Sequence, residues 1–517
     1  MGDYLRRGAL DMAWVLFVVY LAGTAWLGWL GYRRTSGFSS FALGNRDLSP
    51  LVVGITLAAS TASAATFIIN PGFVYVDGFS AWFHMVVGTA IGFITMLYVL
   101  SFRFRRIGEQ NKALTIPDWI GKRYGSRPFA LYFAVLNLLL FAFVVLLVGG
   151  ISIVMQSLLG VSNTIALAIT LIFVTGYVFV GGTYAHVLTN VLQGTLMIGV
   201  TILILGACVQ IVFVDPAALI DRLASIDPNL VKLVNRDGRL FNDVFSIYIA
   251  GFVVGAVLTC QPHILTKALY VKTDKEVRQY LFIFTIIFLL FFLLGTAGFF
   301  AHLVVSPEAL VDPATNQFRQ DLVMTAFLKS VFPGWAFTVI SVVLLAAAMS
   351  TLDGLLVAIS TITANDLVLN LFDSGAESHE ARMTFALKTS HAVLLVIAVA
   401  AFLINLNPPP LLGVFGQVGV YGLAVSAAPP LLLGVLFRRV PVALAWPASA
   451  AALSIHFALY FGGHTLFPGS PLTFANPGVT AAIAALATIP VMLAAGSFIA
   501  ARAAPDVAEQ AGVNPHP

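Results

Sequence analysis

The stretch that decides the fold is TLAASTASAAT, residues 56–66, which lies inside a long apolar run. All of its residues except one leucine are small or hydroxylated, and Asn70-Pro71-Gly72 follow it. A membrane helix of this composition can unwind and leave backbone carbonyls facing a cavity. We therefore predict an interrupted membrane helix at this place, and we expect it to end at residues 70–72.

A second stretch of the same kind, GFVVGAVLTCQPH, occupies residues 251–263. Pro262 has no amide N–H to donate, and its ring clashes with the preceding helical turn. The sequence therefore predicts a second helix break at Pro262. Small residues in membrane helices often serve only close helix packing, and this is the alternative for each break taken alone.

The composition around these stretches is that of a membrane protein. Apolar residues make up 59% of the 517, charged residues only 10%, and the mean hydropathy is +0.95. Soluble domains carry about 25% charged residues, whereas a membrane helix needs roughly 20 consecutive apolar ones. The chain offers about thirteen such runs, a leading one over 12–31 and others centred near 62, 91, 142, 171, 199, 254, 290, 348, 395, 424, 451 and 489. We predict an all-α polytopic membrane protein.

The two broken spans are the first and the sixth after the leading helix. Two repeats of five helices require this spacing, and because five is odd the second repeat is inverted. Paired breaks at equivalent places mark the binding site of inverted-repeat transporters. We expect one transmembrane domain over 1–517, with the leading helix at 12–31, the first repeat at 50–215, the inverted repeat at 243–437, two peripheral helices at 440–500 and a tail at 501–517.

The basic residues predict the orientation of the chain. Most of the 27 Lys and Arg fall on one side if the amino terminus lies outside, mainly in the clusters 103–127 and 267–278. The positive-inside rule then places the amino terminus outside and the carboxy terminus in the cytoplasm. We expect a plasma membrane, in particular a bacterial inner membrane. The clusters could instead bind anionic lipid or nucleic acid; we expect contact with lipid and none with nucleic acid.

The chain has no Gly-x-x-x-x-Gly-Lys phosphate-binding sequence, so an ATP-driven pump would need a separate subunit. The longest polar stretches, 103–128 and 214–243, are too short for a soluble domain of any size. We therefore expect a transporter or a channel, not an enzyme. The sequence leaves the oligomeric state open, with a monomer as one possibility.

A third feature is the segment AAAMSTLDG, residues 346–354, in the span centred near 348. It sets two adjacent hydroxyls and one carboxylate, Asp353, in an otherwise apolar run. Such an acid is costly in lipid and marks an ion or proton path by default. Sodium takes oxygen ligands, which unwound helices supply. A cage of five oxygens would come from the carbonyls of Thr61, Ala64 and Ala347 and the hydroxyls of Ser350 and Thr351.

Polar and aromatic groups near the breaks are candidates for binding a solute: Ser63, Thr66, Phe67, His84, Tyr248, Gln261, His263 and Gln417. We expect no Lys or Arg inside a span. An anionic solute would therefore be held by the amino ends of half-helices. His84 and His263 fit a structural role better than a ligating one. No metal site beyond sodium is expected, because no second His or Cys stands at ligand spacing.

At these residues the sequence resembles the sodium/solute symporter family, which includes proline, pantothenate, acetate, sialic acid and sugar carriers. The resemblance covers nearly the whole chain through Ala42-Leu43-Gly44-Asn45-Arg46, Gly181-Gly182, Pro262-His263 and Ala347-Ala348-Met349-Ser350-Thr351. It implies a LeuT-like core of five plus five helices behind one leading helix, alternating access, and a sodium site at Thr61, Ala64, Ala347, Ser350 and Thr351. Pro262-His263 and the Lys-rich stretch after it look most like the pantothenate and acetate branch.

The chain also departs from the family pattern. Ser63 stands where the proline carriers have an acid, and Asn190 stands where some members have an aspartate near a second sodium site. Asp353 falls where several relatives have a neutral residue. We therefore predict a second cation site at Asp353 and Asn190, on neighbouring helices. The alternative is that Asp353 faces a cytoplasmic water cavity or caps a neighbouring helix.

The resemblance implies sodium-coupled symport of a small organic solute, such as a monocarboxylate, pantothenate or an amino acid. Two alternatives remain open from the residues alone. A proton could replace sodium, with Asp353 or His263 as its carrier. A passive channel or facilitator would transport the solute without any coupling ion, and its flux would not change when sodium is removed.

Overall fold

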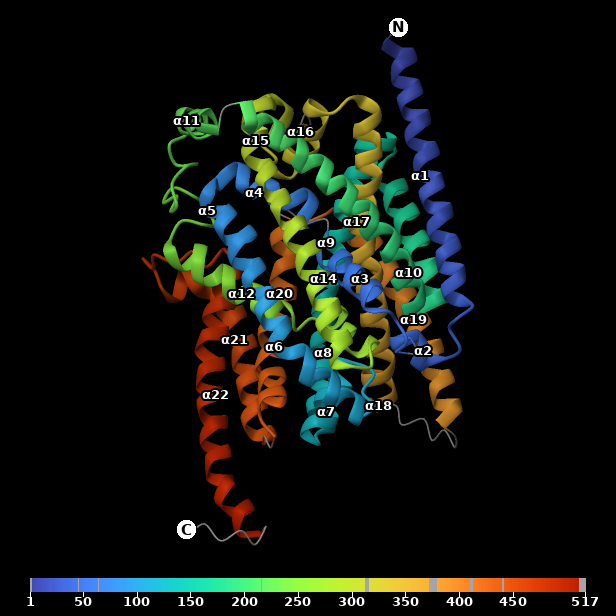
Figure 1. Ribbon diagram of the computed structural model, residues 1–517, viewed down its shortest axis with the longest axis vertical. Coiled ribbons are helices and arrows are strands. Elements are labelled where there is room, and N and C mark those ends of the chain that lie inside the picture. The colour runs from blue at the N-terminus through green and yellow to red at the C-terminus, as the bar shows by residue number, and fades with distance from the viewer. Residues whose placement is uncertain are drawn as a thin grey trace.

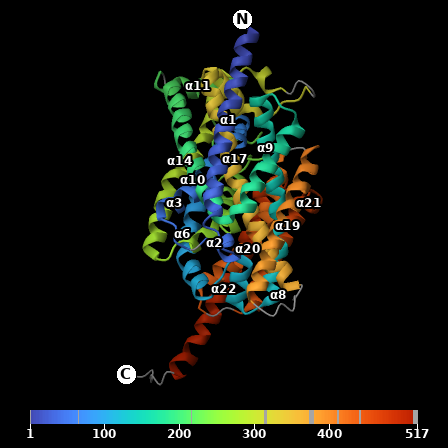
Figure 2. The same cartoon turned by 90° about the vertical axis from the view of Figure 1, so that its right-hand side faces the viewer.

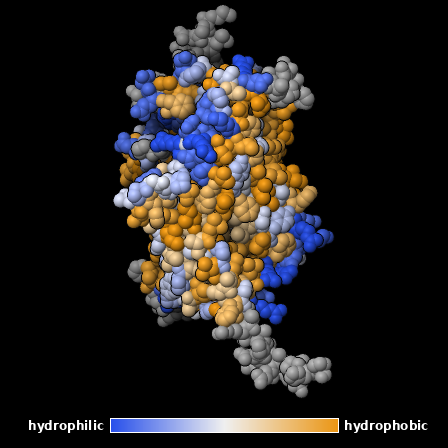
Figure 3. Space-filling view, turned by 90° about the vertical axis from the view of Figure 1, so that its left-hand side faces the viewer, coloured by the Kyte–Doolittle hydropathy of each residue, from blue (hydrophilic) through white to orange (hydrophobic). Residues whose placement is uncertain are grey.

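The structure is a computed structural model, and it describes residues 2–44, 46–63, 65–214, 216–311, 316–371, 379–409, 412–438 and 441–510. The regular elements in these ranges are helices, apart from one isolated bridge between Val311 and Phe318. Most of the long helices run along the long axis of the molecule (Figures 1 and 2). Figure 3 shows apolar surface around the middle and polar surface gathered toward the ends. The predicted all-α membrane fold is confirmed.

The helices follow one another in this order: α1 Gly2–Tyr32, α2 Phe38–Leu43, α3 Pro50–Thr61, α4 Asn70–Asp77, α5 Phe79–Trp82, α6 Thr89–Gln110, α7 Ile116–Tyr124, α8 Arg127–Leu136, α9 Phe141–Leu159, α10 Asn163–Val214, α11 Pro216–Ile226, α12 Ala250–Leu258, α13 Pro262–Leu265, α14 Asp274–Phe292, α15 Ala297–Val304, α16 Val323–Val331, α17 Gly334–Ile362, α18 Leu369–Leu371, α19 His379–Asn405, α20 Leu412–Leu436, α21 Val442–Leu466 and α22 Pro477–Gln510. Short π- and 3₁₀-helical turns join several of them, among them Ala65–Ile69 and Thr266–Tyr270.

The described part has ten helices long and apolar enough to cross a membrane, or up to twelve if each of two bent pairs is one span. One of the ten lies in α10, whose 52 residues would measure about 78 Å as a straight helix, far more than a bilayer needs. Gly182 interrupts α10 with φ 51° and ψ −136°. A Cβ there would meet Phe41 Cδ2 at 2.5 Å, so glycine makes this bend possible. The predicted spans near 171 and 199 lie on the two arms, and the number thirteen stays a prediction.

The first predicted break is confirmed. α3 ends at Thr61, Ala62 has the non-helical angles φ −84° and ψ 78°, and the chain resumes as a helix at an angle of 55°. The predicted end at residues 70–72 was wrong, because these residues begin α4, which continues to Asp77. A proline is tolerated in the first turn of a helix, where its missing N–H has no partner to lose.

The second predicted break is also confirmed. Gln261 is extended, with φ −69° and ψ 140°, and Pro262 is the first residue of α13. The two halves meet at 64°. α13 and the 3₁₀ turn after it then carry Lys267 into the packed helices, where it is only 1% exposed. The expectation that no Lys or Arg lies inside a span was therefore wrong, since the break turns a residue assigned to a loop back into the core.

α17 lies at the centre of the packing, between α3, α9 and both α1 and α10. Every residue from Ile340 to Val357 is buried, so this helix faces protein on all sides. α12 packs on α6, while α20, α21 and α22 pack together at the opposite side from α1 (Figure 1). The amino end of α1 and the carboxyl end of α22 lie at opposite ends of the molecule. α22 continues helically through residues 501–510 of the expected tail.

Candidate functional site

A cavity of about 780 Å³ lies between the two helix breaks. Six of the eight residues predicted to bind a solute line it: Ser63, Thr66, His84, Gln261, His263 and Gln417. The other two are not in its lining. Phe67 is fully buried, with its ring 5.4 Å from that of Phe291, and Tyr248 is 37% exposed, with its hydroxyl donating to the Leu233 carbonyl at 3.2 Å.

Two buried polar atoms of this lining have no hydrogen-bond partner among the described residues. They are Gln261 Oε1 and His263 Nδ1. The Gln261 amide nitrogen is held by the Leu258 carbonyl at 2.9 Å, which fixes the side chain at the break. A buried polar atom without a partner costs free energy. These two atoms are therefore suited to bond a polar solute or water in the cavity.

His84 is held differently. Its Nδ1 lies 2.6 Å from the Ser246 carbonyl, an arrangement typical of a structural histidine, although the ring also lines the cavity. The rest of the lining is largely apolar and aromatic, including Phe93, Phe143 and Phe292. The described lining contains no Asp, Glu, Lys or Arg. The cavity can therefore bury apolar parts of a small solute and bond its polar parts with uncharged groups.

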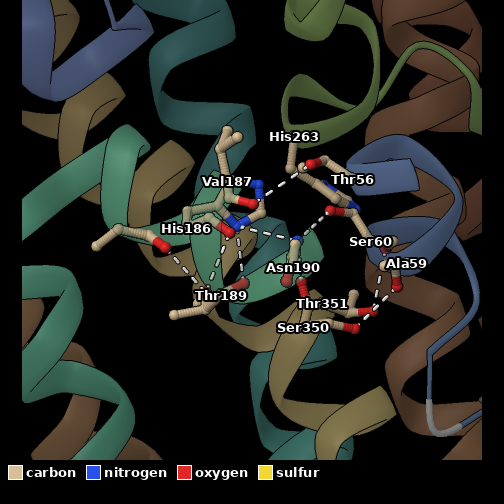
Figure 4. Close-up of polar contacts among 12 residues, drawn as sticks. Thr56, Ala59, Ser60, His186, Val187, Thr189, Asn190, His263, Ser350 and Thr351 are labelled. Atoms are coloured by element: carbon tan, nitrogen blue, oxygen red, sulfur yellow. Dashed lines mark hydrogen bonds and ion pairs between the residues drawn. The ribbon is translucent and has the colours of Figure 1, made fainter. Parts of the chain in front are cut away.

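The predicted sodium ligands of α17 meet the last turn of α3. Ser350 Oγ donates to the carbonyls of Ala59 at 2.9 Å and Ala347 at 2.7 Å. Thr351 Oγ1 donates to the Ser60 carbonyl at 3.0 Å (Figure 4). Thr61 Oγ1 donates to Leu57 of its own helix at 2.6 Å.

Ala59 and Ser60 thus lie opposite the α17 hydroxyls, two residues and one residue before the predicted ligand Thr61. Ala64, the other ligand predicted on this segment, lies outside the described residues. What the structure shows directly is a contact of hydroxyls and carbonyls between α3 and α17, next to the first break.

Asn190 adds a third helix to this contact. Its Nδ2 donates to Ser60 Oγ at 2.9 Å and to the Ser350 carbonyl at 3.1 Å. Figure 4 shows Asn190 between His186 and Ser60, with Ser350 close by. Asn190 Oδ1 is buried and has no hydrogen-bond partner among the described residues. α10 and α17 pack side by side, as expected for the helices that carry Asn190 and Asp353.

Asp353 is completely buried and is bonded by three side chains of α10. Its Oδ1 lies 2.8 Å from His186 Nδ1, and its Oδ2 accepts from the hydroxyls of Tyr177 at 3.0 Å and Thr189 at 3.2 Å. The described contacts neither open this carboxylate to water nor place it at a helix end. They hold it inside a polar network between α10 and α17.

Sequence reasoning missed four members of this network, Tyr177, His186, Thr189 and Lys267. Lys267 Nζ lies 3.2 Å from His186 Nε2 and donates to the His263 carbonyl at 2.7 Å. A signal for His186 existed, because it precedes Asn190 by four residues and so shares its helix face. Lys267 gave no such signal, since a lysine shortly after an apolar run is usually a loop residue.

Comparison with known proteins shows the family of the chain. The family model described as the sodium:solute symporter family matches residues 41–449. The chain is 27% identical over 434 residues to the sodium/pantothenate symporter of Haemophilus influenzae, covering 82% of this chain and 85% of that protein. It is 26% identical over 433 residues to the sodium/proline symporter of Escherichia coli, covering 82% and 83%. These identities do not separate the pantothenate branch from the proline branch.

Among solved structures, a Na⁺-coupled sialic acid symporter in a substrate-bound, outward-open state matches with a TM-score of 0.72. The match covers 93% of this chain and 97% of that one at 17% identity, and it shows the fold. The family and these relatives are transporters, which agrees with the expectation that the chain is not an enzyme. The chain is a multi-pass membrane protein that belongs to the sodium:solute symporter family, and its coupling ion is sodium.

Proposed function

We propose that the chain carries a small organic solute, a monocarboxylate, pantothenate or an amino acid, together with sodium by alternating access. The solute binds in the cavity between the two helix breaks, and sodium binds between α3 and α17. The observation that carries this proposal is that Ser60 belongs to both places. It is one of the residues that line the solute cavity, and its carbonyl accepts the bond from Thr351.

The sodium site is supported by the chemistry of that contact. The Ser350 hydroxyl donates to the carbonyls of Ala59 and Ala347, and the Thr351 hydroxyl donates to the Ser60 carbonyl. A sodium ion between the helices would coordinate the hydroxyl oxygens of α17 and the carbonyl oxygens of α3 at the same time. In the hydrogen bonds the hydroxyl groups act only as donors. Because α3 ends at Thr61, tightening α3 against α17 also positions the first break. Sodium and solute therefore raise each other's affinity, as linkage requires.

The solute class is supported by the lining. Neutral donors and acceptors such as Thr66 and Gln261 are combined with aromatic rings, and the described lining has no acidic side chain that would repel a carboxylate. Pantothenate and proline, named for two relatives, both carry a carboxylate beside an apolar part. Backbone amides freed at the first break would receive the carboxylate. The protein would lie in a plasma membrane, a bacterial inner membrane, with its amino terminus outside and its carboxy terminus in the cytoplasm.

The proposal is tested by a thermal-shift screen of the purified chain against small carboxylates and amino acids, in sodium chloride and in choline chloride. Only a ligand that binds the folded state raises the melting temperature. We expect at least one solute to raise it in sodium and to raise it much less in choline. Uptake of that solute into proteoliposomes should then depend on a sodium gradient. Uptake driven by a pH gradient without sodium, or flux indifferent to sodium, would contradict the proposal.

A further inference from the structure

We propose that Lys267 is an internal cation that neutralises Asp353 through His186, so that the chain binds one sodium where a second would otherwise sit. This inference rests on the proposed function, and it goes beyond it by assigning the number of coupled ions to a specific residue. It also changes the predicted role of Asp353 and Asn190. In the native chain they do not hold a second cation, but they would do so once the charge of Lys267 is removed.

The three groups form a continuous line across three segments. Lys267 Nζ lies 3.2 Å from His186 Nε2, and His186 Nδ1 lies 2.8 Å from Asp353 Oδ1. Lys267 follows the second break, His186 is on α10 and Asp353 is on α17. All three side chains are buried, with exposures of 1% or less. The line therefore lies among the packed helices.

The donors and acceptors fix the direction of this line. An ammonium group only donates, so His186 Nε2 must accept from Lys267, and Nδ1 must carry the ring hydrogen. Nδ1 then donates to Asp353. Asn190 Nδ2 also lies 3.3 Å from His186 Nδ1, but its two hydrogens are given to the nearer Ser60 Oγ and Ser350 carbonyl, so Asn190 does not compete. His186 is neutral in this arrangement, and it links one positive group to one negative group.

The negative charge of Asp353 and the positive charge of Lys267 neutralise each other. Asp353 accepts from Tyr177 and Thr189 as well as from His186, which suits a carboxylate. The other described partner of Lys267 is the uncharged His263 carbonyl. An isolated charge buried in a protein is very costly unless it is paired. Each of these two groups therefore supplies the countercharge that the other needs.

The same place holds the oxygens of a cation site. The carboxylate of Asp353 accepts from the hydroxyl of Thr189 and from His186, and Asn190 Nδ2 lies 3.3 Å from the same His186 Nδ1. Asn190 Oδ1 is buried without a hydrogen-bond partner among the described residues. The Ser350 carbonyl adjoins the same side chain. Hard cations take such oxygen ligands. Lys267 already provides the positive charge that a second cation would bring to these oxygens.

Two further observations show that the line is built into the fold. A Cβ on Gly354 would lie 2.9 Å from His186 Cε1, so the imidazole packs directly against the backbone of α17. A second cavity of about 380 Å³ is lined by His186, His263 and Lys267. Lys267 lines this second cavity and is not in the lining of the solute cavity, whereas His263 lines both.

The test is a count of radioactive sodium bound per chain, measured on the purified full-length protein in detergent. We expect one sodium for the wild type and two for Lys267→Met. Lys267→Arg keeps the charge and should bind one. Lys267→Met combined with Asp353→Asn lacks the new site and should also bind one. Lys329→Met removes an exposed lysine on α16 and is the matched control, with one sodium expected.

A second measurement covers the case in which Lys267→Met folds poorly. That variant leaves Asp353 uncompensated, so its melting temperature should rise steeply with sodium, whereas choline should have no effect. Adding Asp353→Asn should restore the melting temperature toward the wild-type value. If the double variant is less stable than both single variants, the two charges are not paired and the inference is wrong.

Two sodium ions in the wild type, or one in a folded Lys267→Met, would overturn this inference alone. No sodium bound by the wild type would instead overturn the proposed function and, with it, this inference.

Discussion

The two helix breaks are built in different ways. The first follows α3 and contains no proline at the break itself; Ala62 and Ser63 leave the helix, and uncharged hydroxyls from α17 hold the turn before it. The second is imposed by Pro262 and is followed by Lys267, which is tied to α10 through His186. The first break is thus held by weak, exchangeable bonds, and the second by covalent geometry and charge.

This difference indicates which function each break is suited to. A neutral hydrogen bond contributes only about 0.5–1.5 kcal/mol net, so an ion can replace the bonds at the first break at small cost. Removing one partner of a buried charged pair costs about 3–5 kcal/mol. The first break is suited to bind and release sodium in each cycle, and the second is suited to stay in place.

The largest effect should come from the charged line at the second break. His186→Leu removes the link between Lys267 and Asp353 and leaves two buried charges without their bridge. His186 makes two hydrogen bonds to charged groups, each worth about 1.5–3 kcal/mol. We therefore expect the unfolding free energy to fall by about 3 kcal/mol or more, seen as a lower melting temperature in detergent. His391→Leu is the matched control, since that imidazole is not part of the line. Equal losses of unfolding free energy in His186→Leu and His391→Leu would contradict the claim that the charged line stabilises the second break.

A smaller but more specific effect is expected at the first break. Ser350→Ala combined with Thr351→Ala removes two oxygens that would face the ion, each worth about 1.5 kcal/mol or more as a bond to a charge. The sodium concentration for half-maximal uptake should rise about 100-fold, while the protein still reaches the membrane. Ser360→Ala, a buried hydroxyl further along α17, is the control. Unchanged sodium dependence in the double variant would exclude this sodium site.

Polar groups at both breaks should contribute to solute affinity to a similar extent. Thr66→Ala and Gln261→Ala each remove one polar group from the lining of the cavity, and each should weaken solute binding by about 1–3 kcal/mol. The measurement is the dissociation constant in saturating sodium. Wild-type affinity in both variants would move the solute site elsewhere.

The smallest effect is expected outside the cavity. The Tyr248 hydroxyl bonds the Leu233 carbonyl, and this residue is 37% exposed, so Tyr248→Phe should change solute affinity by less than about 0.5 kcal/mol. From the sequence, Tyr248 is predicted to bind the solute, as Gln261 is. A loss as large as that of Gln261→Ala would restore the original prediction.

The contrast between the breaks also explains what could be predicted from the sequence. Pro262 and the small residues around Ser63 act locally on the backbone, so both breaks could be located from the sequence. The end of the first broken helix could not, because Pro71 is compatible with the first turn of a helix as well as with a stop. Asp353 was recognised as a buried acid, since its neighbours along the chain are apolar.

The partners of Asp353 could not be predicted in the same way. His186 and Lys267 are distant in sequence and meet Asp353 only after α13 turns back into the core. A pattern read along one segment contains no information about such a turn. For the same reason Phe67 and Tyr248 were assigned to the cavity by their place in the chain, whereas the packing of neighbouring helices decides which side chains line it.

The central claim is that sodium at the first break and solute in the cavity are coupled through α3. The most direct measurement takes the solute that gives the largest thermal shift in sodium and determines its affinity with and without sodium, together with the affinity of sodium with and without that solute. In the wild type, each ligand should increase the affinity of the other by the same factor. In Ser350→Ala combined with Thr351→Ala, both factors should fall to about one. Solute affinity that is equal in sodium and choline in the wild type would contradict this claim.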